Sequence, residues 1–169
     1  ATAAITLTAE TVAPGAVTVV ASDADGNPLS GATRDNVPVL GGTAEAGAIV
    51  TLYDGDNPVG SVQADATNGT WSFTVPQLAD GSHTLSALAT DAAGNVSPAG
   101  NSVTLNVDAT APETSDFIVT NDNVTPGVLV PNDGTTDDKT PQLSGNAEAG
   151  ALVTIYDNGV EIGSVQADA

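Results

Sequence analysis

Residues 38–66 read PVLGGTAEAGAIVTLYDGDNPVGSVQADA, and residues 141–169 read PQLSGNAEAGALVTIYDNGVEIGSVQADA. The two stretches align without a gap, and 19 of their 29 positions are identical. Self-similarity at a fixed offset is the signature of a repeat architecture. The chain therefore contains at least two copies of one structural repeat.

A second, weaker match fixes the boundaries of the repeat. Residues 5–7 resemble residues 103–105, and the segment that ends at Pro14 resembles the segment that ends at Pro112. The repeat is therefore about a hundred residues long. We expect the last strand of a preceding repeat at 1–10, a complete repeat at 11–108 and the first part of the next repeat at 109–169. The 169 residues then form a window cut from a longer array.

Short strands separated by turns are the dominant local pattern. The chain has 18 Gly and 10 Pro and no helical periodicity, and residues 71–75 and 83–87 alternate between apolar and polar side chains. Seven short strands in about a hundred residues predict an all-β, immunoglobulin-like sandwich. We expect the strands at 15–21, 37–43, 48–53, 59–64, 70–75, 81–90 and 102–108, and a core that includes Val50, Leu52, Trp71, Phe73, Leu85 and Ala87.

The composition excludes several classes of function. Two Lys or Arg residues stand against 21 Asp or Glu residues, a net charge of −19, which argues against nucleic-acid binding and against docking on an anionic membrane. There is no Cys, and the single His, His83, is expected to be structural because no nucleophile and orienting acid accompany it. We therefore expect no enzymatic activity and no insertion into a membrane.

Two longer stretches resemble a known family. They are residues 42–112, GTAEAGAIVTLYDGDNPVGSVQADATNGTWSFTVPQLADGSHTLSALATDAAGNVSPAGNSVTLNVDATAP, and residues 136–159, TDDKTPQLSGNAEAGALVTIYDNG. They resemble the tandem bacterial Ig-like repeats of giant secreted RTX-type adhesins and biofilm-associated proteins. The resemblance implies a calcium-binding stalk at the bacterial cell surface, exported by type I secretion. It also implies neighbouring repeats as partners, and host or matrix surfaces reached through distal domains.

Alternating strands place several acidic loops at one end of the complete repeat. These loops carry Glu45, Asp65 and Asp91, and the entry linker adds Glu10. The equivalents in the next repeat are Asp108, Glu148 and Asp168. Facing carboxylates repel one another without a cation, and Ca²⁺ takes six to eight oxygen ligands. The sequence predicts structural Ca²⁺ at each junction between repeats, whereas solvated loop acids are the alternative reading.

A second acidic cluster is expected at the opposite end of the partial repeat. It contains Asp137, Asp138 and Asp157 as weaker candidates for metal ligands. Arg34 replaces Asp137 in the complete repeat, which argues against a shared metal site there. The segment from Asp23 to Asn27 has a faint resemblance to an EF-hand loop, but Arg34 stands where that loop needs a glutamate, so we interpret the segment as a turn.

Three functions remain open at this point. The first is a structural spacer in an adhesin stalk, which near-identical neighbouring repeats favour. The second is an Ig-like module that binds a glycan or a host surface protein, which would need exposed aromatic residues on one repeat. The third is an accessory domain of a secreted enzyme, which would need a catalytic domain elsewhere in the protein.

Overall fold

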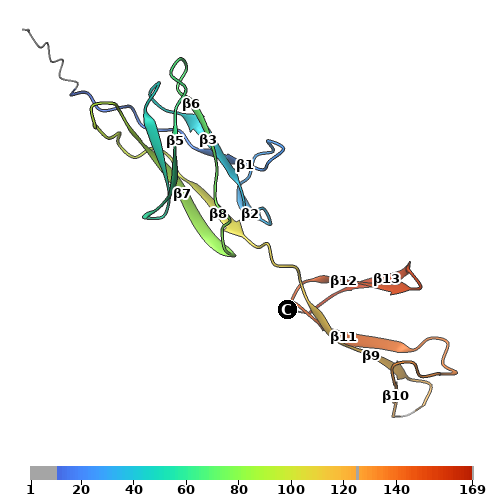
Figure 1. Ribbon diagram of the computed structural model, residues 1–169. Coiled ribbons are helices and arrows are strands. Elements are labelled where there is room, and N and C mark those ends of the chain that lie inside the picture. Colours follow the sequence, from blue (N-terminus) through green and yellow to red (C-terminus); the bar gives the residue numbers. More distant parts are fainter. Residues whose placement is uncertain (1–10, 125, 169) are drawn as a thin grey trace, which may run out of the picture. The chain divides into compact units, whose positions relative to one another are not determined.

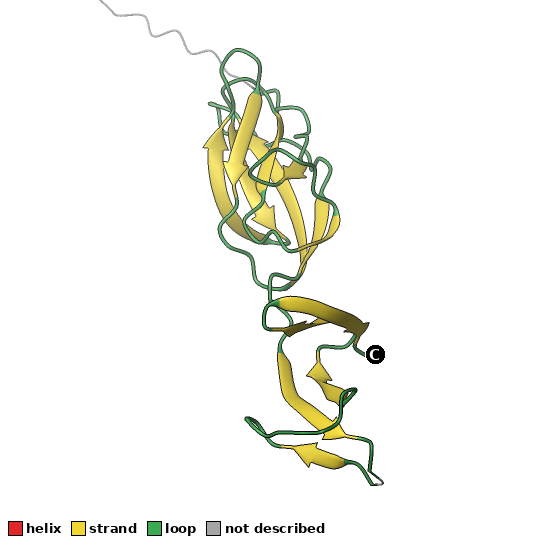
Figure 2. Cartoon of the chain, turned by 90° about the vertical axis from the view of Figure 1, so that its right-hand side faces the viewer, coloured by secondary structure: helices red, strands yellow, loops and turns green. Residues whose placement is uncertain are grey.

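The computed structural model describes residues 11–124 and 126–168, and these residues form strands and loops without a helix (Figure 2). No helix in this described part could therefore span a membrane. The predicted all-β fold class is confirmed. The chain divides into two compact units, unit 1 (Ala1–Thr110) and unit 2 (Ala111–Ala169), and each is described by itself.

Unit 1 is a sandwich of two sheets (Figure 1). One sheet has the strand order β1-β3-β6, and the other has the order β2-β8-β7-β4-β5. Neighbouring strands are antiparallel except for the parallel pair β2 and β8. The strands are β1 (Val20–Ser22), β2 (Gly31–Thr33), β3 (Val39–Thr43), β4 (Ile49–Asp54), β5 (Asn57–Gln63), β6 (Thr70–Thr74), β7 (Gly81–Thr90) and β8 (Val103–Val107).

All seven predicted strands overlap a strand of unit 1, but the first one is shorter than expected and β2 was not predicted. Residues 15–19 lie outside β1; Thr18 N still donates to Thr43 O at 3.0 Å, whereas at Val19 a side chain takes the place of a partner strand. Val19 N donates to Oδ1 of Asn101 at 2.9 Å, and Nδ2 of Asn101 donates to Val19 O at 2.7 Å. The three-residue β2 is too short for a period-2 pattern to identify it.

The core of unit 1 consists mainly of Val, Leu and Ala, as the scarcity of aromatic residues requires. Five of the six predicted core residues are buried, and Phe73 is half-buried and packs against that core. The Phe73 ring lies over Gly60 of β5, where a Cβ atom would be 2.2 Å from Cζ of the ring. Trp71 is 5% exposed, and its indole N–H has no hydrogen-bond partner in the described part of the chain.

Unit 2 contains counterparts of the first half of unit 1. Its strands are β9 (Thr114–Asn121), β10 (Val128–Val130), β11 (Gln142–Ala147), β12 (Leu152–Asp157) and β13 (Val160–Gln166). They form two sheets, β10-β9-β11 and β12-β13, around an open cleft of about 740 Å³. The described residues of unit 2 show no counterpart of β6, β7 or β8. Phe117 and Tyr156 consequently remain exposed in the cleft.

Candidate functional site

The predicted junction acids of unit 1 lie on loops that come partly together. Ala44 N donates to Gly69 O at 2.9 Å, so the loops that carry Glu45 and Asp65 meet at one end of the sandwich. Alternating strand direction correctly predicts this meeting. However, no three Asp, Glu or His residues of the described ranges form a group that could hold a metal ion. Glu10 lies outside the described residues.

Asp65 and Asp91 both use carboxylate oxygens to close their own loops. Oδ1 of Asp65 accepts from Thr67 N and Asn68 N, and these bonds lower the pKa of that carboxyl. The pKa of Asp91 is lowered first by the side chain of Asn95, whose Nδ2 donates to Oδ2 at 2.7 Å. Oδ1 of Asp91 also accepts from two backbone N–H groups of its loop. Asp65 thus keeps one oxygen for a cation, whereas Asp91 fits a metal site poorly.

The segment that begins at Asp23 is a turn, as predicted, and it repeats the loop of Asp91. Oδ1 of Asp23 accepts from Asp25 N and Asn27 N, and Nδ2 of Asn27 donates to Oδ2 at 2.8 Å. These bonds lower the pKa of Asp23, with the side chain of Asn27 as the largest cause. The shared pattern Asp-x-x-Gly-Asn therefore has a structural use at both positions.

The weaker candidates in unit 2 also stabilise local structure. Buried Asp138 accepts from Thr140 N at 2.9 Å and from Asp122 N at 3.1 Å, and its pKa is lowered mainly by Thr140. Asp137 accepts from Asn121, and Asp157 accepts from Asn158. The described part of unit 2 therefore shows no assembled metal cluster at these residues.

The acids of unit 2 that belong to the predicted junction lie on neighbouring segments. Glu148 is in the turn between β11 and β12, and Asp168 follows β13. Gly150 N donates to Ala167 O at 3.1 Å and so joins the two segments. The predicted partner, Asp108, belongs to unit 1, where its backbone N–H donates to Thr33 O at 2.9 Å. The role of all three acids in metal binding stays a prediction.

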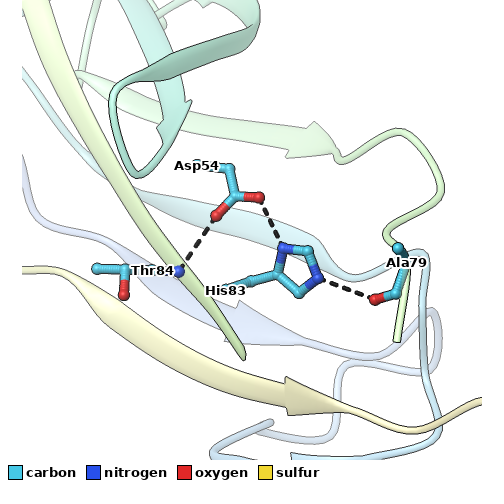
Figure 3. A network of polar contacts seen from close by, with 4 residues as sticks. All are labelled: Asp54, Ala79, His83 and Thr84. Carbon is cyan, nitrogen blue, oxygen red and sulfur yellow. Dashed lines mark hydrogen bonds and ion pairs between the residues drawn. The ribbon is translucent and has the colours of Figure 1, made fainter. Parts of the chain in front are cut away.

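The opposite end of unit 1 contains a polar network around His83 (Figure 3). Nδ1 of His83 is 2.6 Å from Oδ2 of Asp54, and Nε2 is 2.9 Å from Ala79 O. The His83 and Asp54 side chains are only 14% and 26% exposed. The hydrogen bond to Asp54 raises the pKa of His83, and the Ala79 carbonyl raises it further. Two acceptors around one ring favour the imidazolium, which has two N–H donors.

Asp80, in the same loop, binds the segment that follows β8. Oδ1 of Asp80 accepts from Ala109 N at 2.8 Å, and Oδ2 accepts from the hydroxyl of Thr110. The bond from Thr110 is the largest cause of a lowered pKa at Asp80. Neither Asp80 nor the pairing of Asp54 with His83 follows from the sequence patterns. Their partners lie 29 or 30 residues away, and Asp80 resembled an ordinary turn residue before a glycine.

The model of the bacterial Ig-like domain family matches residues 8–109, which is more than half of the chain. The chain belongs to this family. Comparison with the curated proteins finds no match. Bacterial Ig-like domains are common in surface and secreted proteins. The match covers the complete sandwich of unit 1 together with the network of His83 and the contact between Asp80 and Ala109.

In this bacterial Ig-like domain the single histidine has a structural environment. Both ring nitrogens of His83 already face acceptors within the domain. General base catalysis needs a nitrogen that can reach a substrate proton. Other acidic side chains of the described structure also accept from backbone N–H groups, namely Asp23, Asp65, Asp80, Asp91 and Asp138. The geometry therefore supports a stabilising role for these residues in the Ig-like domain.

Proposed function

We propose that this chain is a structural spacer, a segment of the stalk of a large extracellular bacterial adhesin that supports cell adhesion and biofilm formation. The single observation that carries the proposal is the similarity of the two neighbouring repeats, which share 19 of 29 aligned positions and an identical loop at Glu45 and Glu148, although residues 55–59 differ throughout from residues 158–162. A binding module needs loops that differ from those of its neighbours, whereas a spacer needs repeated units. We further propose export by type I secretion and no enzymatic activity.

The exposed aromatic residues do not favour a glycan-binding role. Phe117 and Tyr156 are exposed and line the open cleft of unit 2. Tyr53, the counterpart of Tyr156 in unit 1, is half-buried. The same tyrosine position is thus partly covered in unit 1, which does not favour an exposed aromatic binding platform on each repeat.

Calcium at the junctions between repeats is the second part of the proposal. The set of ligands would be one linker acid and two loop acids of the following repeat, namely Glu10, Glu45 and Asp65, or Asp108, Glu148 and Asp168. The recurrence of these acids and the net charge of −19 support it. Asp91 is a weaker ligand because its oxygens serve its own loop. When bound, Ca²⁺ would neutralise these carboxylates and hold the linker on the loops.

Small-angle scattering on proteins with two, three and four complete repeats tests the spacer role. We expect the maximum dimension to grow by a constant increment for each repeat. A dimension that stops growing with repeat number would contradict a stalk.

The calcium part is tested by the same measurement in calcium and in EDTA, together with melting temperatures. An ion at a hundredfold excess over its Kd stabilises the folded state by about 2.7 kcal/mol. We expect Asp108→Ala to reproduce the EDTA state and Asp56→Ala, in the turn between β4 and β5, to behave as wild type. Equal dimensions and equal melting temperatures in calcium and in EDTA would contradict the calcium sites but would not contradict the spacer role.

A further inference from the structure

The segment that leaves the sandwich of unit 1 is held at several successive residues. Residue Val107 ends β8, and Asp108 N then donates to Thr33 O at 2.9 Å. Ala109 N donates to Oδ1 of Asp80 at 2.8 Å, and the Thr110 hydroxyl donates to Oδ2 of the same carboxylate. One carboxylate therefore binds two consecutive linker residues, and hydrogen bonds to a charged acceptor are stronger than neutral ones.

The loop that carries Asp80 is itself anchored to the sandwich. Val75 N donates to Pro38 O at 2.9 Å, and Leu78 N donates to Asn36 O at 2.8 Å. The side chain of Leu78 is buried in the core. The last anchor before Asp80 is the Ala79 carbonyl, which lies 2.9 Å from Nε2 of His83 (Figure 3). Asp80 therefore lies between Ala79, whose carbonyl contacts His83, and Gly81, which begins β7 and pairs with Val107 of β8.

His83 can make both of its contacts only in the doubly protonated form. A neutral imidazole has one N–H group, whereas Oδ2 of Asp54 and the Ala79 carbonyl are both acceptors. Loss of the proton therefore removes the donor to one of them. Asp54 is the one charged group in the described part that contacts the ring. The other charged groups on the elements around His83 are Asp56 after β4, Arg34 and Asp35 before β3, Asp80 on the loop itself and Asp108 after β8.

We propose that Asp80 is a clamp that fastens Ala109 and Thr110 to unit 1, and that the imidazolium of His83 holds the loop that carries the clamp. The part of the linker that unit 1 does not hold by hydrogen bonds then begins at Ala111 and not directly after β8. Ala111 is itself restricted to extended conformations because Pro112 follows it. The clamp is independent of calcium and shortens the segment through which an array of such units can bend.

Backbone ¹⁵N relaxation on the full chain tests the clamp. In wild type at slightly acidic pH we expect Ala109 and Thr110 to have order parameters near those of β8, about 0.85, which is typical of rigid backbone. Asp80→Ala should lower both toward the flexible range, below about 0.6. Thr110→Val, which keeps the Ala109 bond, should give an intermediate loss. Asp56→Ala is the matched control, because it removes an acid from the same unit without touching the linker.

The role of His83 is tested by repeating the relaxation measurement at pH values below and above the titration of its imidazole. The ¹⁵N chemical shifts of the ring report the protonation state at each pH. Deprotonation should raise the mobility of residues 79–81 and of Ala109 in wild type, and His83→Gln should make that mobility independent of pH. Unchanged amide shifts of β3 and β6, which form the opposite sheet, show that each variant is folded. The clamp is overturned if Ala109 stays rigid in Asp80→Ala or is already mobile in wild type. The supporting role of His83 is overturned if mobility does not change across the titration.

Discussion

Leu40 and Leu143 occupy the same position in the two copies of the repeat, yet Leu40 is fully buried and Leu143 is half-buried. The same holds for Val50, which is fully buried, and Val153, which is half-buried. Strand registers nevertheless agree. Val50 pairs with Val62 and Val153 with Val165, and both hairpins have a bulge at the equivalent position.

The difference in burial between the two units shows that local sequence determines strand pairing, whereas strands distant in sequence determine how deeply the side chains are buried. The hairpin of β4 and β5 and the hairpin of β12 and β13 form alike because their sequences are alike. In unit 1, β4 lies between β5 and β7, and its apolar side chains are covered by the opposite sheet. Among the described residues of unit 2, β12 pairs with β13 alone. Strand formation is thus local, whereas burial depends on β6, β7 and β8.

The largest expected effect is at Trp71, which lies on a strand without a counterpart in unit 2. Trp71→Ala should lower the free energy of unfolding of unit 1 by about 3–5 kcal/mol, because it opens a cavity in the core. Trp71→Phe should cost clearly less, because it keeps an aromatic ring and removes an N–H group that has no partner in the described structure. Urea unfolding followed by NMR signals of each unit measures both. An unchanged stability of unit 1 in Trp71→Ala would show that the register of β6 is wrong.

The matched pair Leu40→Ala and Leu143→Ala tests the comparison itself. Leu40→Ala should destabilise unit 1 by about 2–5 kcal/mol, the usual cost for a buried leucine. Leu143→Ala should cost unit 2 much less, since its side chain already contacts water. Trp71 fluorescence follows unit 1 alone, because it is the one Trp of the chain. Equal losses in the two units would mean that the core of unit 2 is as closed as that of unit 1.

A second matched pair, Gly60→Ala and Gly163→Ala, tests the difference between the two units at one contact, that of Gly60 with the Phe73 ring. Gly60→Ala should cost unit 1 about 1–3 kcal/mol, because the new methyl group would overlap the Phe73 ring. Gly163→Ala, at the equivalent position of β13, should stay within about 0.5 kcal/mol, because no atom lies within 4 Å of its Cβ position. Thermal unfolding of the two variants checks this. Destabilisation by Gly163→Ala of the same size would contradict the open face of unit 2.

The smallest expected effect is a dependence of stability on pH that unit 1 alone shows. The single histidine lies there, and folding raises its pKa above the ordinary value of about 6.5. A raised pKa means that the folded state holds the proton more strongly. The stabilisation is therefore complete below about pH 6.5 and is lost as pH rises through the pKa of folded His83. We expect a loss below about 1 kcal/mol, as for other partly exposed pairs.

Urea unfolding followed by Trp71 fluorescence, at several pH values between about 5.5 and 9, measures this loss. His83→Gln should give a flat profile over the same range. A wild-type stability that rises with pH would reverse the expected sign and exclude the ion pair with Asp54.

The sequence predicts the strands and most of the core, because alternation and turn residues are local signals. It also predicts which loops share an end of the sandwich, as the contact between Ala44 and Gly69 confirms. It does not predict β2, which exists through its pairing with β8. Nor does it predict that the side chain of Asn101 replaces a strand partner of Val19, because those residues are 82 positions apart.

The candidate sites likewise combine features that the local sequence predicts with features that depend on residues far away in the chain. The identity of each acid is visible in the sequence, but its partner is not. The sequence predicts Asp91 as a metal ligand, and that role stays a prediction; in the structure its oxygens accept hydrogen bonds from its own loop. The sequence predicts no role for Asp80, whose carboxylate accepts a hydrogen bond from the linker. A hydrogen bond forms only when donor and acceptor lie within a narrow range of distances, and the order of the strands does not fix positions to about an ångström. The calcium sites at the junctions therefore stay a prediction.

Hydrogen exchange of Val50 and Val153 is the most direct test of the central claim, that distant strands and not local sequence close the core. The two valines have the same residue type, nearly identical neighbours and equivalent strands. Core strands exchange only through global unfolding, whereas open regions exchange by local opening. We predict that the Val50 amide exchanges at least about a hundredfold more slowly than the Val153 amide. Equal protection of the two amides would contradict the account.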